Sequence, residues 1–180
     1  MNAITYKEVF PLIKNDKMWL GNGFKAGNAF FLSPITNDYT DGVFDPNTGL
    51  VKFRNVVWFT NLEHGRRHQP LPLMTMADNI KFSKHKEIKG KEYQKYDNYD
   101  AIEVPYTDAI PSDYEGVMGV PISFLDKYCP DQFEILGATE SEGRGFSNGL
   151  WDEKSQVSQP LTNGNRVYKR IFIKHRNPTI

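Results

Sequence analysis

Apolar residues of this chain occur mainly in short runs bounded by turn-forming residues, a pattern typical of β-strands. In the segment 166–175, Val167, Ile171 and Ile173 share one face, and Arg170 and Lys174 share the other. Asp45-Pro46-Asn47-Thr48-Gly49 predicts a turn, because proline presets φ and asparagine and glycine tolerate positive φ. Further strands are predicted for 18–20, 29–32, 50–60 (one long strand or a bulged pair), 101–104 and 133–136.

Two short helices complete the predicted elements. Thr5 and Glu8 have the spacing of a capping box, which predicts a helix beginning at Thr5. Because Pro11 removes a backbone donor, this helix should be short or kinked and end near Asn15. Proline at the first position of 121–128 favours a second short helix there. The predicted fold class is therefore α/β or α+β, with mostly strands.

Charge is balanced overall but separated along the chain. A length of 180 residues favours one domain, and 22 basic against 22 acidic side chains exclude a polycation or an acidic tail protein. Segment 52–95 has 10 basic and 4 acidic side chains (+6), 96–165 has 3 and 13 (−10), and 166–180 has 5 and 0 (+5). If the two basic segments lie side by side, they form a surface suited to a phosphate backbone. The alternative is a dipolar but inert surface.

The cysteine content and the N-terminus indicate the compartment. Cys129 is the single cysteine, so it has no partner for an internal disulfide, and a reducing, cytoplasmic location is expected. No signal peptide or membrane-spanning run is recognisable, so no membrane association is expected. Cys129 also has no histidine close in sequence, which favours a packed side chain over a nucleophile.

Two motifs have a chemical and a structural interpretation. His64 and His68 have the i,i+4 spacing of helical metal ligands, but Gly65 disfavours a helix and no third ligand is close, so no metal site is predicted. The glycine-rich segment 21–27 resembles half of a dinucleotide fingerprint. A strand-like segment follows it instead of a helix N-terminus, so a loop is the better interpretation.

Aromatic and basic side chains are interleaved in the segment 52–91. Cations suit phosphates and planar rings suit an unstacked base, so this pattern indicates nucleic-acid contact, although aromatics at the end of a strand can also be core residues. A carbohydrate-binding surface is a further alternative that the lysine density disfavours. The predicted DNA-contacting residues are Lys52, Arg54, Trp58, Phe59, Asn61, Arg66, Arg67, His68, Lys84, Lys86, Lys89 and Lys91.

Several segments, in a fixed order, match a known family. They are 2–14 (NAITYKEVFPLIK), 18–21 (MWLG), 57–62 (VWFTNL), 95–102 (KYDNYDAI), and 113–128 (DYEGVMGVPISFLDKY) with 133–137 (FEILG). These segments resemble the EcoRI-type adenine-specific DNA methyltransferases, and the resemblance spans nearly the whole chain. It implies methyl transfer from S-adenosylmethionine to adenine N6 in duplex DNA, within a restriction–modification system, after the base has been flipped out of the stack.

The family's catalytic motifs are not found in this sequence. The resemblance implies a glycine-rich motif for S-adenosylmethionine and an Asn-Pro-Pro-aromatic motif for the target adenine. The chain has Asn177-Pro178, which is followed by threonine rather than by proline and an aromatic residue. No catalytic residue is therefore assigned, and no cofactor is expected to bind this chain alone. Val56–Leu62 resembles the strand that borders the target-base pocket.

The resemblance implies a C-terminal portion of the enzyme. Residues 1–62 are expected to be the remaining C-terminal part of a Rossmann-like methyltransferase domain, and residues 63–180 a mostly β, target-recognising region. Duplex DNA is the expected partner, with a missing N-terminal half or a second copy as further partners, because an exposed sheet edge pairs with any available strand. The alternatives are a DNA-binding module without catalysis, and a protein-interaction domain that uses the acidic segment 96–165.

Overall fold

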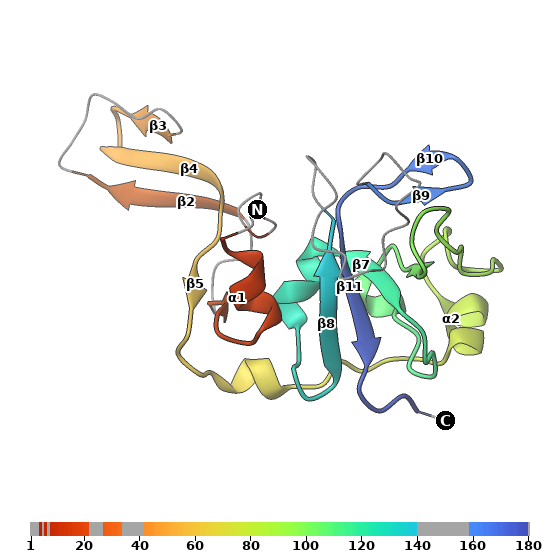
Figure 1. Cartoon of the computed structure of the whole chain (residues 1–180). Coiled ribbons are helices and arrows are strands. Elements are labelled where there is room, and N and C mark those ends of the chain that lie inside the picture. Colours follow the sequence, from red (N-terminus) through yellow and green to blue (C-terminus); the bar gives the residue numbers. More distant parts are fainter. Residues whose placement is uncertain are drawn as a thin grey trace.

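A mixed fold with more strands than helices is seen in the computed structural model, as the sequence predicts (Figure 1). The structure describes residues 4, 6, 8–21, 27–33, 42–139 and 159–179. It is consistent with an α+β class. A Rossmann-like part is not established by these elements.

A four-stranded sheet forms the centre of the fold, in the order β6-β7-β11-β8. β6 pairs with β7 in parallel, and β11 pairs with β7 and β8 in antiparallel fashion. The predicted strands at 101–104 and 133–136 lie in this sheet, as does the 170–175 part of the strand predicted for 166–175, whereas Arg166 pairs with Leu161 in a separate sheet. The bounds are β6 (Ile102–Glu103), β7 (Met118–Pro121), β8 (Phe133–Ala138) and β11 (Arg170–His175).

Strand β11 is buried on both of its faces. Ile171 and Ile173 share one face, as predicted, and lie in the main hydrophobic cluster. Phe172 points to the other face, where it packs with Tyr96 and Tyr99 in a second cluster. The predicted alternation is therefore present within β11, but Val167, predicted on the Ile171 face, precedes the strand and packs against the second cluster. The second face is not a solvent face, because aromatic side chains from the segment before β6 cover it.

The first helix, α1 (Phe10–Lys14), is shorter than the sequence predicts. It begins at Phe10 instead of residue 5, and Pro11 lies in its first turn, where a missing backbone donor costs nothing. The predicted end near Asn15 is confirmed. Thr5, the cap predicted for this helix, lies outside the described residues. The helix places Phe10 and Ile13 in the main cluster.

A second, three-stranded sheet has the order β2-β4-β3, and we call it the arm. It extends away from the central sheet in Figure 1. The predicted turn at Asp45–Gly49 joins two of its strands: the Gly49 N–H donates to the Asp45 carbonyl oxygen at 2.9 Å, and Gly49 has φ of +67°. The strands are β2 (Gly27–Leu32), β3 (Gly42–Asp45) and β4 (Leu50–Val56).

The predicted long strand at 50–60 is two strands in different sheets. β4 belongs to the arm, whereas β5 (Phe59–Thr60) pairs with β1 (Trp19–Leu20) beside the main core. Leu20 and Phe59 pack against the main cluster. This cluster therefore contains residues from both sides of residue 62, the boundary that the sequence analysis proposes.

The remaining elements are short. The predicted helix at 121–128 is a 3-10 helix, η4 (Ile122–Lys127), with Pro121 as its N-cap. The segment 62–99, irregular by its pattern, contains η2 and α2. The other bounds are η2 (Gly65–His68), α2 (Met76–Phe82), η3 (Thr107–Ala109), β9 (Leu161–Thr162) and β10 (Asn165–Arg166). Among the described residues, no helix has the length and apolarity needed to cross a membrane.

His175, at the end of β11, should make stability depend on pH. Burial lowers the pKa of His175, although its Nε2 lies 2.8 Å from the Pro111 carbonyl oxygen, an interaction that raises it. Because the folded-state pKa is below the unfolded value of about 6.5, this stability is present above about pH 6.5 and is lost as the pH falls through the folded pKa. His175→Gln should remove this loss in urea unfolding measured across the acid range.

His68 provides the control with the opposite sign. Hydrogen bonds with Asp131 and then Glu63 raise the pKa of His68. Its contribution is therefore present below about pH 6.5 and is lost as the pH rises through the folded value. His68→Gln should remove this contribution, so at acid pH this variant should be less stable than the unaltered chain, whereas His175→Gln should be relatively more stable there. An unaltered pH dependence in His175→Gln would contradict the assignment.

Candidate nucleic-acid interface

The lysine-rich segment after α2 is a fixed turn, which we call the basic turn (residues 84–91). The preceding helix, α2, has Thr75 as its N-cap, and the Thr75 side-chain oxygen accepts a hydrogen bond from the Asp78 N–H at 3.1 Å. Ile88 anchors the turn because its side chain is buried, and the Gly90 N–H donates to the Ile80 carbonyl oxygen at 2.8 Å. The fixed backbone leaves four side chains exposed: Lys84, Lys86, Lys89 and Lys91.

Two acidic residues partly offset the charge of the basic turn: Glu87 lies within it, and Asp108 pairs with two of its side chains. Lys84 Nζ lies 2.7 Å from Asp108 Oδ2, and His85 Nε2 lies 2.8 Å from Asp108 Oδ1. Burial works against ionisation of Asp108, but these two hydrogen bonds lower its pKa. The Lys84 pair is exposed and therefore weak. Within the part of the chain that the structure describes, Lys86, Lys89 and Lys91 form no ion pair; the Glu87 carboxylate interacts with Lys91 at longer range and reduces the local positive field without cancelling it.

His85 and Tyr106 form a stacked pair beside these lysines. Their ring centroids are 3.7 Å apart and the planes differ by 4°. Tyr106 also hydrogen-bonds Glu87, which raises the pKa of the Tyr106 hydroxyl. The turn is thus held to the segment before η3 by a ring stack and by side-chain hydrogen bonds. Its lysines are presented by a supported backbone, not by a free loop.

The cations of η2 form ion pairs that hold parts of the fold together. Arg67 is buried and forms ion pairs with both Asp16 and Glu63, and its guanidinium lies 3.7 Å from the centre of the Trp19 ring. Arg66 Nη2 lies 3.0 Å from Asp126 Oδ2. Sequence reasoning grouped these arginines with the DNA-contacting residues, since a charge count does not reveal partners.

His68 completes this set of ion pairs. Its Nδ1 lies 2.6 Å from Asp131 Oδ2, and its Nε2 lies 3.3 Å from Glu63 Oε2. Unlike Arg67, it is exposed. Glu63 therefore connects two cations of η2, and the acidic groups lie in segments far apart along the chain.

Arg67→Met should destabilise the fold by about 2–3 kcal/mol, although the new side chain is apolar. The substitution removes two ion pairs and the cation–π contact with Trp19, while the freed carboxylates reach solvent and limit the loss. Arg66→Met, which changes a half-exposed side chain, is the matched control and should cost less. Urea unfolding measures both variants, and equal losses would contradict the role given to Arg67.

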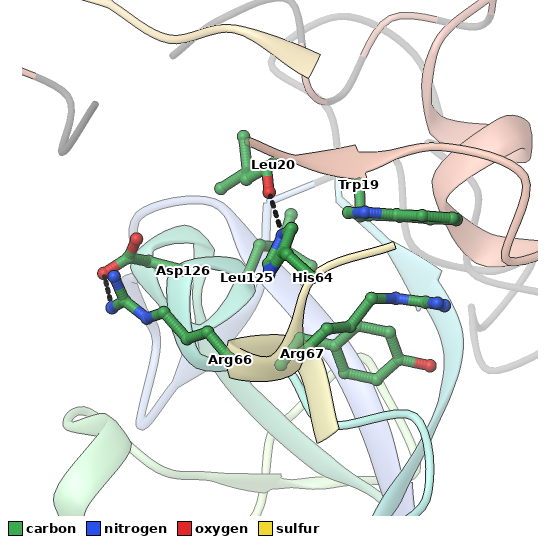
Figure 2. A pocket seen from close by; sticks show the side chains of 8 residues that line it. Trp19, Leu20, His64, Arg66, Arg67, Leu125 and Asp126 are labelled. Atoms are coloured by element: carbon green, nitrogen blue, oxygen red, sulfur yellow. Dashed lines mark hydrogen bonds and ion pairs between the residues drawn. The ribbon is translucent and has the colours of Figure 1, made fainter. Parts of the chain in front are cut away.

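A small pocket lies beside Arg67, as Figure 2 shows. His64 Nε2 is 3.3 Å from the Leu20 carbonyl oxygen, whereas His64 Nδ1 and Arg67 Nε are buried without a hydrogen-bond partner in the described structure. The cavity of about 20 Å³ is large enough for one water molecule. Its lining consists of Trp19, Leu20, His64, Arg66, Arg67, Leu125, Asp126 and Tyr128.

The other predicted contact residues are spread over the arm and β5. Lys52 lies on β4 with its Nζ 5.8 Å from the centre of the Phe30 ring, and Arg54 on the same strand is exposed. Phe59 packs against the main cluster and Asn61 is exposed. Trp58, partly exposed, covers Gly21, where any Cβ would overlap the indole ring.

These positions form separate groups instead of one continuous surface. In Figure 1, β4 and α2 lie on opposite sides of the central sheet. The basic segment 166–180 does not extend the basic turn as a whole, because Lys169 and Arg170 are buried. The structure therefore divides the predicted cations into three groups: the lysines of 84–91, the cations of η2, and Lys52 with Arg54 on the arm.

Sequence reasoning missed the exposed apolar side chains of the arm. Phe30, Phe31, Leu32 and Val43 are all exposed, although their pattern is that of ordinary strand residues. The sequence held only a weak indication of this exposure. Segment 29–32 is apolar at every position, so both faces of the strand are apolar, and each must be covered by other residues or remain exposed. Within the described ranges, no three His, Cys, Asp or Glu residues lie together in an arrangement that would hold a metal ion.

Comparisons with known proteins place the chain in a family. The family model of the adenine-specific methyltransferase EcoRI matches residues 1–176. Relatives are the Type II methyltransferases M.EcoRI of Escherichia coli (41% identical, 98% of this chain and 48% of the relative), M.MgeORF184P of Mycoplasma genitalium (32%, 96% and 54%) and M.MpnI of Mycoplasma pneumoniae (32%, 99% and 55%).

No solved structure matches this chain. The chain spans about half the length of the curated relatives that it matches. Identity to M.EcoRI extends over 181 aligned residues, so it is not confined to one short motif. The chain belongs to the EcoRI family of adenine-specific methyltransferases.

Proposed function

We propose that this chain is the DNA-contacting, C-terminal portion of an S-adenosylmethionine-dependent adenine-N6 DNA methyltransferase of a restriction–modification system. Its membership of the adenine-specific family carries the proposal. Duplex DNA is then the partner, and the basic turn is the first element proposed to contact it. Exposed lysines on a supported backbone suit phosphates, which bind through charge and counterion release.

The residues predicted to contact DNA are proposed to have different roles. Lys84, Lys86, Lys89 and Lys91 of the basic turn, with Lys52 and Arg54 of the arm, are the proposed phosphate contacts. Trp58, Phe59 and Asn61 are proposed to border the target base. Arg66, Arg67 and His68 are proposed to act indirectly, because their charged groups already hold carboxylates of this chain.

Methyl transfer is not expected from this chain alone. Its sequence has no Asn-Pro-Pro-aromatic segment, and the pocket beside Arg67, about 20 Å³, is far smaller than the roughly 300 Å³ of typical small-molecule sites. The residues around that pocket therefore do not fit S-adenosylmethionine, and no step is assigned to the cofactor here. The half of the family's length that this chain does not span is the proposed source of catalysis.

We propose that residues 1–62 and residues 63–180 have different partners, although they are not separate domains. Residues 1–62 would face the missing half of the enzyme and residues 63–180 the DNA. Both parts contribute to the main core, so they are proposed to fold together, not as independent domains. Self-association through a sheet edge is the alternative to contact with the missing half.

Reconstitution tests the methyltransferase assignment. The chain is mixed with a separately produced polypeptide that corresponds to the half of M.EcoRI that it does not match, and transfer of labelled methyl groups from S-adenosylmethionine to duplex DNA is measured. We expect transfer by the mixture and none by either part alone. Transfer by this chain alone would contradict the proposal, as would DNA binding by the chain without any transfer by the mixture.

A protein-interaction domain is the second candidate, and it rests on the acidic segment 96–165, with 3 basic and 13 acidic side chains. It predicts no affinity for DNA at physiological salt. Several of these acids are already occupied within the described structure: Asp108, Asp126 and Asp131 bind cations of the basic turn and of η2. This internal use favours the DNA-contacting function.

A further inference from the structure

The arm presents two chemically different faces. The register of its strands places Phe30, Lys52 and Val43 side by side across the sheet. Residues on the opposite face include Ala29 and Val51, whose side chains are buried. Phe31 is also on this opposite face, where it is 43% exposed and contacts the Phe53 ring, so this face is partly packed while the Phe30 face is left to solvent.

The solvent face is unusually apolar. Phe30 is 57% exposed, Val43 is 58% exposed, and Leu32, two residues along from Phe30, is 83% exposed. Contiguous exposed apolar groups of this kind mark binding surfaces in soluble proteins. The arm also extends away from the central sheet (Figure 1), so this face is not covered by the described core.

Lys52 shares this face with the apolar groups, and Arg54 is exposed next to a register shift between β2 and β4. Lys52 reaches over the Phe30 ring, with its Nζ 5.8 Å from the ring centre, and Arg54 lies two residues further along β4. One acidic residue of this face, Asp45, is half-buried, and its Oδ1 accepts the Asn47 N–H at 2.9 Å within the turn. The described part of this face therefore has a cation, Lys52, between apolar side chains on both sides of it.

We propose that this face of the arm is a second DNA-contacting surface, separate from the basic turn, that lies along a groove of the duplex. The proposal rests on the proposed function. Lys52 and Arg54 would neutralise phosphates, and Phe30, Leu32 and Val43 would press on sugar and base edges. Sheets and ribbons that carry cations and apolar wedges are a known means of contacting DNA grooves.

Affinity measured across a salt series separates the two kinds of contact. Lys52→Gln with Arg54→Gln should reduce the slope of log K against log salt by about 1.8, because each phosphate contact contributes about 0.9. Phe30→Ser with Leu32→Ser should weaken binding about tenfold without altering the slope, since apolar contacts release no counterions. Tyr168→Ser, at an exposed aromatic outside the arm, is the control and should bind as the unaltered chain does.

Photo-crosslinking locates the contact directly. The single natural cysteine, Cys129, is buried, so Val43→Cys supplies one exposed thiol for a benzophenone maleimide. Light should join this position to bound duplex, and the matched Tyr168→Cys conjugate should not be joined. Far-ultraviolet circular dichroism of each variant verifies that the fold is retained.

The outcomes distinguish this inference from the proposed function. If the unaltered chain binds no duplex, both fail. If it binds, but the arm variants keep full affinity and slope and the Val43→Cys conjugate forms no crosslink, the inference fails and the proposed function stands. If the Phe30→Ser, Leu32→Ser variant changes the mass of the protein by light scattering and leaves DNA binding intact, the face is a protein interface and the inference is wrong.

Discussion

Replacing Glu103 with alanine is expected to lower the free energy of unfolding by about 3–5 kcal/mol. Glu103 binds the buried guanidinium of Arg170, with Arg170 Nη2 donating to Glu103 Oε1 at 2.6 Å and Arg170 Nε donating to Glu103 Oε2 at 3.1 Å. Tyr96 donates its hydroxyl to the same carboxylate. The side chains of Arg170 and Glu103 are only 10% and 12% exposed, so alanine would leave a buried charge without its partner.

Urea unfolding of the variant tests this expectation. Asp100→Ala is the matched control, because Asp100 pairs with Lys95 at 2.9 Å but both side chains are exposed. Its loss should be no more than about 1 kcal/mol. A loss in Glu103→Ala that is no larger than the loss in the control would contradict the role given to this buried pair.

The second large effect concerns DNA. Changing Lys84, Lys86, Lys89 and Lys91 of the basic turn to glutamine should reduce the slope of log K against log salt by about 3.6 if all four contact phosphates. The same arithmetic predicts a loss of affinity of about 10³-fold near ~0.15 M salt. Stability should be nearly unchanged, because the four side chains are exposed and the turn is held by Ile88 and by its backbone.

A control with the same change of charge separates local contact from the general field. It replaces four cations elsewhere on the chain, Lys14, Lys17, Lys127 and Lys174. Fluorescence anisotropy on a labelled duplex should show a smaller change in slope for this control. Equal changes in both variants would mean that net charge, not the basic turn, determines binding.

Local patterns predicted most of the regular elements. The Asp45–Gly49 turn and the strands at 29–32, 101–104 and 133–136 are present because turn chemistry and apolar runs act over a few residues. The segment 50–60 was harder, since the pattern is continuous while the strands β4 and β5 pair with different partners. Such pairing is a long-range property that periodicity does not contain.

The candidate site was predicted less well than the strands. Arg67 and Lys89 are both basic residues in a basic segment, yet one is buried between two carboxylates and the other is exposed. Glu63 is only four residues before Arg67, but Asp16, which follows α1, reaches Arg67 only once the chain has folded. Likewise, Phe30 and Phe31 are consecutive residues of β2, so their side chains lie on opposite faces of the arm. Nothing in the local sequence indicates that both are exposed.

Binding of the unaltered chain to duplex DNA tests the central claim most directly. Fluorescence anisotropy is measured on a labelled duplex with an adenine-containing palindrome and on a scrambled duplex, each across a salt series. The account predicts binding that weakens steeply with salt, and a preference for one duplex would add sequence recognition. Absence of binding to either duplex, even at low salt, would contradict the claim that this chain contacts DNA.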